Sequence, residues 1–378
     1  MVVYRGYRFK LKGDPALEQR LKVFAGHCRF VWNKALRLNL DRLDSGLPTI
    51  RFNDLCGLLH LWKKSEEYGF LAEANAQTLQ QKLRDLDRAF ADAFDPSQPG
   101  KRLPRFKKRG IHDRIRFPQD VQVEGCRVFL PKVGWVRFFK SRNVPGTVKQ
   151  ATVTHEADGW YVSLLAETEA DEPKPHPGSE LGVDRGVAVF AATSEGELVE
   201  ALHARRRLQA KMRRLQRKVA RQKKGSKNQA KTRRRIACLH QRIAGTRADF
   251  LHKLSTRWAK SHGTIVLEDL RIGSMTRSAK GTVEDPGRNV AAKSGLNRSI
   301  LDQGWGAFAR MLEYKIRDRG GHLLMVAPQR SSQTCSACGN VDAANRPNRD
   351  TFRCTSCRYS EHADVNAAKV ILQRGLAA

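Results

Sequence analysis

The sequence predicts a multidomain α/β protein whose N-terminal part is mostly β. The chain has 378 residues, more than a single hydrophobic core usually organises. A proline-rich stretch, EADEPKPHPGSE, lies near the middle of the chain and has the composition of a linker. Short β-like runs precede this stretch, whereas strands and helices alternate after it, which is typical of an α/β domain.

The N-terminal part begins with a strand and a helical insert. In YRFKLK, apolar and basic residues alternate, as in a half-buried strand. Asp14-Pro15 has the residue types of a helix start, and apolar residues then recur at steps of three and four. A second apolar stripe predicts a helix over residues 74–94. Residues 13–95 are therefore expected to form a helical module inserted after the first strand.

A small all-β unit is expected to surround this insert. RIRFP, CRVFLP and WVRFFK have the character of short strands, and ATVTHEADGWYVSLLAE predicts a hairpin that turns at Ala157-Asp158-Gly159. We expect these strands, over residues 96–172, to close a β-barrel together with residues 1–12. The linker is assigned to residues 173–180.

An α/β domain is predicted over residues 181–330 and 359–378. LGVDRGVAVFAATSEGELVE should form two or three short strands, TIVLEDL and HLLMVAP two buried strands, and GWGAFARMLEYKIRDRGG a helix. Residues 271–297 are polar and rich in Gly, Ser and Arg, so a mobile, irregular segment is expected. A cysteine-rich module over residues 331–358 precedes the last helix.

The charge balance predicts a polyanionic partner. The chain carries 70 Lys and Arg against 38 Asp and Glu, a formal net charge of +32. Nucleic acid is the commonest polyanion for such a chain, and an anionic membrane is the alternative. No run of 18 apolar residues exists, and the N-terminus lacks a signal-peptide hydrophobic region. We therefore expect a soluble cytoplasmic protein with no membrane partner.

Four cysteines near the C-terminus have the spacing of a structural zinc site. Two CxxC pairs are separated by fifteen residues, and each pair can direct two thiolates at one ion. No fifth ligand is in view, so the predicted site is closed and structural rather than catalytic. The predicted zinc ligands are Cys335, Cys338, Cys354 and Cys357.

Three acids are notable in the predicted α/β domain, and at two of these positions an ionised side chain is costly unless it is paired or bound to a metal. Asp184 interrupts an apolar strand, Glu268 ends another, and Asp364 begins the last helix. Taken singly, they could be a turn acid, a surface acid at a strand end and a helix cap. Taken together, they can converge on one edge of an α/β domain, where hard oxygen ligands would hold Mg²⁺. Two such ions about 4 Å apart would serve phosphodiester hydrolysis.

The order of these motifs resembles the TnpB family, transposon-encoded RNA-guided DNA endonucleases related to type V CRISPR effectors. GVDRG, IVLEDL, SSQTCSACG, FRCTSC and HADVNAA carry the resemblance, and RFVWNKAL and GWGAFARMLEYK extend it over nearly the whole chain. It implies an RNase H-like RuvC nuclease domain interrupted by a zinc-ribbon module that loads the target strand. It also implies an N-terminal wedge β-barrel with a helical recognition insert. The RuvC catalytic triad falls on Asp184, Glu268 and Asp364, and His362 is assigned to helix entry.

The resemblance also implies the partners and the reaction. A guide RNA (omega RNA) from the right end of the mobile element would direct cleavage of double-stranded DNA beside a short adjacent motif. Two Mg²⁺ ions would serve the chemistry, and a monomer in the prokaryotic cytoplasm, associated with the nucleoid, is favoured. An RNA-guided repressor or transposition accessory protein without cleavage is the alternative. A strand-joining transposase is less favoured, because no nucleophilic tyrosine or integrase-type acid spacing stands out.

Nucleic-acid contacts are predicted on three segments. Residues 204–235 hold 16 Lys and Arg and no acid, and their apolar residues keep helical spacing around a break at KKGSKN. This tract and PRFKKRG are expected to contact RNA or heteroduplex phosphates, although a solvated helical face is the alternative for the tract. Gln and Asn side chains of the insert could read adenine edges beside the target, with surface solvation an equal alternative. The candidates are Arg213, Arg214, Arg217, Lys218, Arg105, Lys107, Lys108, Asn75, Gln77, Gln80 and Gln81.

Overall fold

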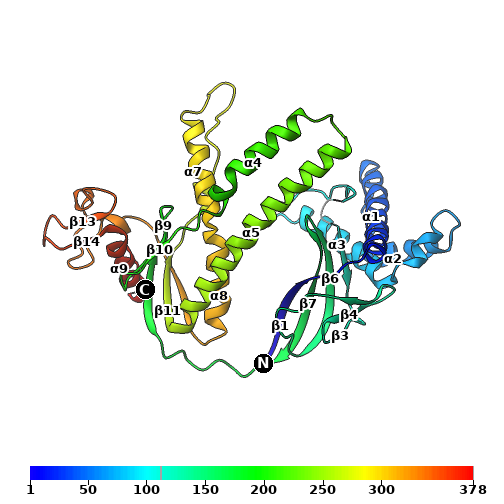
Figure 1. Ribbon diagram of the computed structural model, residues 1–378, viewed down its shortest axis with the longest axis horizontal. Helices are drawn as coiled ribbons and strands as arrows, with labels where there is room; N and C mark the ends of the chain where they lie inside the picture. Colours follow the sequence, from blue (N-terminus) through cyan, green and yellow to red (C-terminus); the bar gives the residue numbers. More distant parts are fainter. Residues whose placement is uncertain (111–112, 378) are drawn as a thin grey trace. The chain divides into compact units, whose positions relative to one another are not determined.

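The computed structural model describes residues 1–110 and 113–377 (Figure 1). The chain divides into two compact units, Met1–Asp171 and Glu172–Ala378, and the division falls at the start of the proline-rich stretch. Each unit has its own hydrophobic core. Among the helices of residues 1–110 and 113–377, none combines the length and the hydrophobicity that a membrane span requires.

Two antiparallel sheets form the β part of the first unit. The larger sheet has the order β1-β7-β6-β2 and the smaller one the order β3-β4-β5. A β-bridge between Leu11 and Phe138 joins the sheets, so the described strands form two linked sheets and closure into the predicted barrel is not confirmed. The strands are β1 (Val2–Lys10), β2 (Arg114–Phe117), β3 (Gln122–Glu124), β4 (Arg127–Leu130), β5 (Gly134–Arg137), β6 (Thr147–Glu156) and β7 (Gly159–Glu169).

Helices between β1 and β2 share one core with these sheets. As predicted, Asp14 caps the first helix by accepting a hydrogen bond from the Leu17 amide at 2.7 Å. The middle helix, α2 (Phe52–Lys64), was not predicted, because no side chain caps its start and only three of its residues are buried. The elements are α1 (Pro15–Asp44), α2 (Phe52–Lys64), η1 (Gly69–Glu73) and α3 (Ala76–Phe94).

A mixed five-stranded sheet organises the second unit and confirms the predicted α/β class. Its order is β10-β9-β8-β11-β12, with β11 parallel to both β8 and β12, and with β9 antiparallel to β8 and β10. The strands are β8 (Ser179–Asp184), β9 (Val189–Thr193), β10 (Leu198–Glu200), β11 (His262–Glu268) and β12 (His322–Val326).

Helices cover both faces of this sheet. Successive side chains of β11 point to opposite faces. Ile265 and Leu267 pack in the core shared with α5 (Lys227–Ser261) and α8 (Trp305–Arg317). Val266 instead packs against Ile371 of α9 (Ala363–Leu376).

Glycine at position 182 permits the close approach of α9 to β8. A Cβ atom there would collide with the Ala368 carbonyl oxygen and lie 2.7 Å from the Leu372 Cβ. The last helix of the chain is thereby held directly against the first strand of the α/β domain.

The basic tract folds as an antiparallel helical hairpin, α4 (Ala204–Arg221) with the N-terminal half of α5 (Figure 1). The predicted break lies between the two helices. Met212 and Leu215 of α4 pack against Leu239 and Ile243 of α5. This ordered apolar seam leaves the basic residues on the outside of the hairpin.

The prediction of an irregular segment over residues 271–297 is wrong in part. α6 (Ile272–Met275) and the start of α7 (Val290–Gln303) lie within it. Only Ile300 and Gln303 of α7 are buried, and no side chain caps its start at Asn289. Neither an apolar stripe nor a cap therefore marks this helix in the sequence.

The cysteine-rich module lies between β12 and α9. It consists of short elements and turns, and its final strand leads without a break into α9. The elements are η2 (Ser331–Gln333), η3 (Ala343–Asn345), β13 (Thr351–Arg353) and β14 (Ser360–His362).

Candidate functional site

The structure brings the three predicted acids to one edge of the α/β sheet. Asp184 and Glu268 are the last residues of β8 and β11, which are adjacent and parallel. Val183 is in register with Leu267, so the two acids follow at the same level. Asp364 stands in the first turn of α9, which packs on β8. The carboxyl ends of two strands and the start of one helix thus meet.

The acids influence one another electrostatically. Burial raises the pKa of Asp184 to about 7, and the negative charges of Glu268 and Asp364 add to this rise. Burial also raises the pKa of Glu268, while a hydrogen bond from Ser331 opposes the rise. Ser331 Oγ donates to Glu268 Oε1 at 2.6 Å, and both residues are buried. Such clustered acids have a high cost unless a cation shares the site.

Two arginines accompany the acids and were not predicted as site residues. Arg346, from the cysteine-rich module, donates to Asp364 Oδ1 at 2.9 Å, and its charge lowers the pKa of Asp184. Arg185 is buried beside Asp184, and its guanidinium donates to the backbone oxygen of Glu268. Burial lowers the pKa of Arg185 to about 10. Arg185 was adjacent to a predicted acid, but Arg346 lies in a polar loop that gave no signal.

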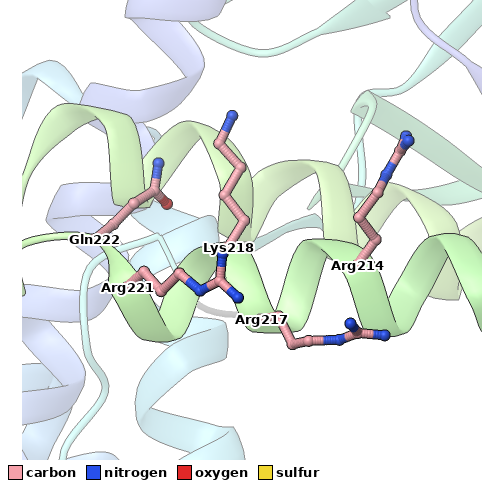
Figure 2. A pocket seen from close by; sticks show the side chains of 5 residues that line it. All are labelled: Arg214, Arg217, Lys218, Arg221 and Gln222. Carbon is pink, nitrogen blue, oxygen red and sulfur yellow. The ribbon is translucent and has the colours of Figure 1, made fainter.

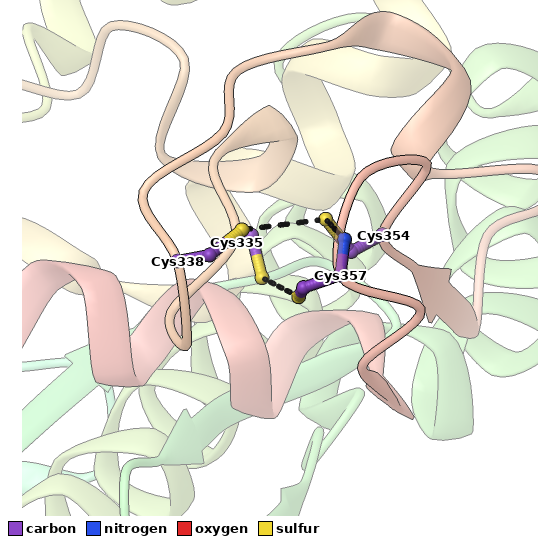
Figure 3. Close-up of side chains that lie close together, drawn as sticks. All are labelled: Cys335, Cys338, Cys354 and Cys357. Atoms are coloured by element: carbon purple, nitrogen blue, oxygen red, sulfur yellow. Dashed lines mark hydrogen bonds between the residues drawn. The ribbon is translucent and has the colours of Figure 1, made fainter.

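The four predicted zinc ligands converge at the centre of their module (Figure 3). All four are free thiols, and their sulfur atoms lie within 4.8 Å of one another. Cys335 Sγ lies 3.7 Å from Cys357 Sγ, and Cys338 Sγ lies 3.6 Å from Cys354 Sγ. A tetrahedral zinc with bonds of about 2.3 Å needs sulfur atoms about 3.8 Å apart. The arrangement therefore fits one structural zinc ion.

Backbone amides prepare one of these thiols for metal binding. The amide of Cys357 donates to Cys354 Sγ at 3.4 Å. This donation is the first cause of a fall in the pKa of Cys354 to about 6. The thiolate is the form that binds zinc, so the Cys357 amide favours the ligand state of Cys354.

Two buried asparagines fasten this module to itself and to α9. The Asn366 side chain on α9 accepts from the Ser336 amide at 3.0 Å and donates to the Thr334 oxygen at 2.8 Å. Asn345 donates to the Gln333 oxygen at 2.9 Å and accepts from the Thr355 amide at 2.8 Å. Both asparagines are fully buried. The first CxxC knuckle is therefore fixed to the helix that carries Asp364.

His362 caps α9, as the sequence predicted. Its ring nitrogen Nδ1 accepts a hydrogen bond from the Asp364 amide at 3.3 Å. The histidine therefore sets the start of the helix two residues before the acid.

The carboxylates form a more open donor set than the thiols. Among residues 1–110 and 113–377, only the four cysteines place three or more ligand atoms from His, Cys, Asp or Glu within 4.8 Å of one another. Asp184, Glu268 and Asp364 nevertheless offer hard oxygen donors from three different elements. Mg²⁺ binds with a few carboxylates and keeps several waters, so an open set of this chemistry suits it.

The predicted basic contacts of the second unit lie on α4. Arg213, Arg214, Arg217 and Lys218 are all exposed. The last three line a surface hollow of about 310 Å³ together with Arg221 and Gln222, and Figure 2 shows these side chains extending from the helix. The hollow has no acidic lining residue, which favours an anion.

The basic loop of the first unit is anchored on α1. Lys107 exchanges two backbone hydrogen bonds with the Asn33 side chain, at 2.8 and 3.0 Å, and its ammonium lies 3.4 Å from the Trp32 ring centroid. Desolvation lowers the pKa of Lys107 to about 8. Arg105 and Lys108 are exposed on the same loop. Phosphate contact by these residues stays a prediction.

The four predicted base-reading residues near the start of α3 differ in their surroundings. Asn75 caps α3 by accepting from the Thr78 amide at 3.0 Å, and Gln81 donates to Asp85 at 3.0 Å. Gln77 has a buried side-chain oxygen with no hydrogen-bond partner, whereas Gln80 is exposed. Their roles in base recognition stay predictions, with Gln80 the most accessible.

Comparison with protein families matches three parts of the chain. Residues 163–279 match a family described as "Probable transposase", and residues 305–371 match "Cas12f1-like, TNB domain". Residues 1–47 match "Helix-turn-helix domain", although here they form strand β1 and the single helix α1.

Full-length relatives extend these matches. The chain is 43% identical over 373 residues to InsQ of Escherichia coli (strain K12), which is named as an RNA-guided DNA endonuclease, with 98% of this chain and 92% of the relative covered. It is 34% identical over 382 residues to a protein of the same description from Streptomyces pristinaespiralis, covering 98% and 89%. The fold is similar to Cas12f1 in a Cas12f1-sgRNA-target DNA complex, with TM-score 0.56, 14% identity and 98% of each chain covered. The chain belongs to the TnpB family, together with InsQ.

Proposed function

We propose that this protein is an RNA-guided DNA endonuclease encoded by a transposable element. One observation supports this most directly: three acids meet at one sheet edge in a protein whose formal net charge is +32. A cluster of acids in so basic a chain suits a metal-dependent reaction on a polyanion. The 43% sequence identity to InsQ, which extends over nearly the whole chain, supports the same reaction class. The protein would act on DNA in the prokaryotic cytoplasm.

Asp184, Glu268 and Asp364 are proposed to hold Mg²⁺ in an RNase H-like RuvC site. The strand order β10-β9-β8-β11-β12 and the covering helix α9 support this assignment. Two bound ions would supply an activated water and stabilise the leaving oxygen of a phosphodiester. Ser331 holds one oxygen of Glu268 in place, and Arg346 balances the charge of Asp364.

The basic hairpin and the loop around Lys107 are proposed to hold the guide RNA by its backbone. The exposed cations of α4 have no acidic neighbour in the hollow that they line. Such contacts recognise the phosphates and shape of RNA or of a guide-target heteroduplex, while base pairing selects the target. The guide would come from the end of the mobile element, and cleavage would occur beside a short motif. The zinc module would then position the target strand relative to Asp364.

A cleavage and binding assay on one variant tests this function. Asp184→Ala should abolish Mg²⁺-dependent cleavage of guide-matched DNA while RNA-dependent DNA binding persists. Asp249→Ala, which removes an exposed acid paired with Lys253 on α5, should cleave normally. A wild type that binds DNA with its guide but does not cut it would favour the alternative, a repressor without cleavage.

Sequencing the RNA that co-purifies with the protein tests the guided part of the proposal. The expected RNA ends at the boundary of the mobile element and contains sequence from its flank. Cleavage that needs no RNA, by protein that purifies free of RNA, would contradict this part alone.

A further inference from the structure

The outer face of the small sheet β3-β4-β5 presents aromatic side chains to solvent. Along β4 and β5 the inward residues Val128, Leu130 and Val136 fill the core. Phe129 and Trp135 alternate with them and therefore point outward. These two residues are directly opposite in the strand register, and their ring centroids lie 5.6 Å apart.

The same alternation continues beyond β5. Phe138 is fully buried at the bridge to Leu11, so Phe139 points outward like Trp135. Trp135 is 41% exposed and Phe139 is 54% exposed. Since valine and leucine already fill the inner side, these rings are not needed to build the core. We name Phe129, Trp135 and Phe139 the aromatic face.

Cations are interleaved with these rings. Arg127 and Arg137 are paired across β4 and β5 on the outer side, one row from the aromatic pair. The Arg127 guanidinium lies 5.4 Å from the Trp135 ring centroid, and the Lys12 ammonium lies 4.9 Å from that of Phe139. One acid, Glu124, lies 3.3 Å from Arg127. The aromatic face is therefore bordered by more positive than negative charge.

Single exposed aromatic residues are common and need no explanation. Three rings on and just beyond one small sheet, with cations beside them, form a more specific pattern. Rings that stack bases, beside cations that contact the backbone, are how many proteins bind single-stranded nucleic acid on a β-sheet. A protein partner could bind through the rings alone, whereas the cations beside the rings favour a partner with a phosphodiester backbone.

We propose that the aromatic face stacks unpaired bases of single-stranded RNA. This inference rests on the proposed function, in which an unpaired segment of the guide RNA would be the natural occupant. The β3-β4-β5 sheet would then hold exposed nucleotides, while the basic hairpin of the second unit contacts phosphates.

Binding of a fluorescent oligouridine to the full chain, purified free of RNA, tests the proposal. Trp135→Ala and Phe139→Ala should each weaken binding by about 5- to 140-fold, the range for loss of one stacked base. Trp135→Tyr should restore most of the affinity, because any aromatic ring can stack. Phe94→Ala removes a 53% exposed phenylalanine at the end of α3 and should leave binding unchanged. Circular dichroism and thermal unfolding establish that the variants are folded.

A photocrosslink locates the RNA independently of affinity. Oligouridine carrying 5-iodouridine should crosslink to Phe129, Trp135 or Phe139, as read by mass spectrometry of the digested protein. Tighter binding of oligothymidine than of oligouridine would assign the face to displaced DNA and overturn the RNA assignment. Unchanged oligouridine affinity in both alanine variants would overturn the platform itself. A change of oligomeric state in the variants, with no change in RNA binding, would instead make the face a protein interface.

These outcomes separate the two proposals. Loss of oligouridine binding in Trp135→Ala alongside a wild type that never cleaves DNA would retain the platform and reject the nuclease. Guided cleavage by the wild type with no effect of the ring variants on RNA binding would retain the nuclease and reject the platform.

Discussion

Ionisation of Asp184 lowers the stability of the folded state. Its pKa rises to about 7 in the folded protein, so the folded state binds the proton more tightly than the unfolded chain does. The stability linked to this proton is present at low pH and is lost as the pH rises from about 4 to about 7. Without a bound metal, the folded protein is therefore less stable with an ionised Asp184 than it would be with a neutral side chain at this position.

Asp184→Asn should raise the stability of the metal-free protein. At pH 8, removing the charge should increase the free energy of unfolding by on the order of 2–4 kcal/mol, because the buried carboxylate no longer has to ionise. Thermal unfolding in a chelating buffer measures this as a rise in Tm of several degrees. The gain should shrink at pH 5, where the folded wild type already holds the proton. A gain equal at both pH values would contradict this account.

Ser331→Ala should destabilise the ionised form of Glu268, because it removes the hydrogen bond to this carboxylate. Loss of the 2.6 Å hydrogen bond leaves a buried carboxylate oxygen without its donor, which should cost about 1–3 kcal/mol. The pKa of Glu268 should rise further, so that half-maximal cleavage needs more Mg²⁺. The neighbouring Ser332→Ala removes a hydroxyl of the same size that is not bonded to Glu268 and is the matched control. Equal Mg²⁺ requirements for the two variants would contradict the role of Ser331.

Single residues were predictable where their chemistry conflicted with their neighbours. Asp184 and Glu268 stand in apolar strands, and Cys335 and Cys354 belong to pairs with metal-ligand spacing, so each raised a question in the sequence alone. Arg346 and Ser331 did not, because a polar residue in a polar loop is ordinary. Tertiary folding alone places the first beside Asp364 and the second beside Glu268.

At the scale of elements, the contact between α9 and β8 depends on one missing side chain. Gly182→Ala would press a Cβ atom against the Ala368 carbonyl oxygen and Leu372. Displacement of α9 should lower the free energy of unfolding by about 1–3 kcal/mol and reduce cleavage, because Asp364 moves with the helix. Denaturant unfolding and the cleavage rate measure the two effects.

Gly245→Ala is the control for this substitution. Nothing lies within 4 Å of a Cβ atom at Gly245, which stands in the middle of α5. There the added methyl group should stabilise the helix by about 0.5–1 kcal/mol. A similar loss of stability in both variants would show that the contact with α9 is not the cause.

Elements were predictable in proportion to their local signals. Helix α1 has a cap, a proline and a long apolar stripe, and its start was located to the residue. Helices α2 and α7 have no side-chain cap at their start and few buried residues, so their sequences resemble loops. The predicted barrel depended on long-range pairing between strands, which no local pattern specifies, and the sheets pair through Leu11 and Phe138 instead.

At the scale of the whole molecule, net charge should govern how binding depends on salt. Replacing Arg214, Arg217, Lys218 and Arg221 by Gln should weaken RNA binding and flatten the plot of log affinity against log salt. Each lost phosphate contact should reduce the slope by about 0.7–0.9. Binding measured over a series of salt concentrations gives both quantities.

A control with the same change of net charge separates contact from general attraction. Lys22, Arg37, Lys253 and Arg257 are exposed, and each already forms an ion pair with an acid. Their replacement by Gln should change the slope much less, because a neighbouring carboxylate already neutralises them. An equal change of slope in both sets would mean that α4 has no special part in binding.

The position of α9 in the chain also decides when the three acids can come together during synthesis. A ribosome releases β8 and β11 long before it reaches Asp364, and domains begin to fold as they emerge. Until α9 has been synthesised, no helix packs on Val266 and Gly182, and only Asp184 and Glu268 of the three acids are present. A chain interrupted before residue 363 therefore has the basic hairpin of α4 and α5 but only two of the three proposed Mg²⁺ ligands. The order of translation thus completes the proposed metal site last.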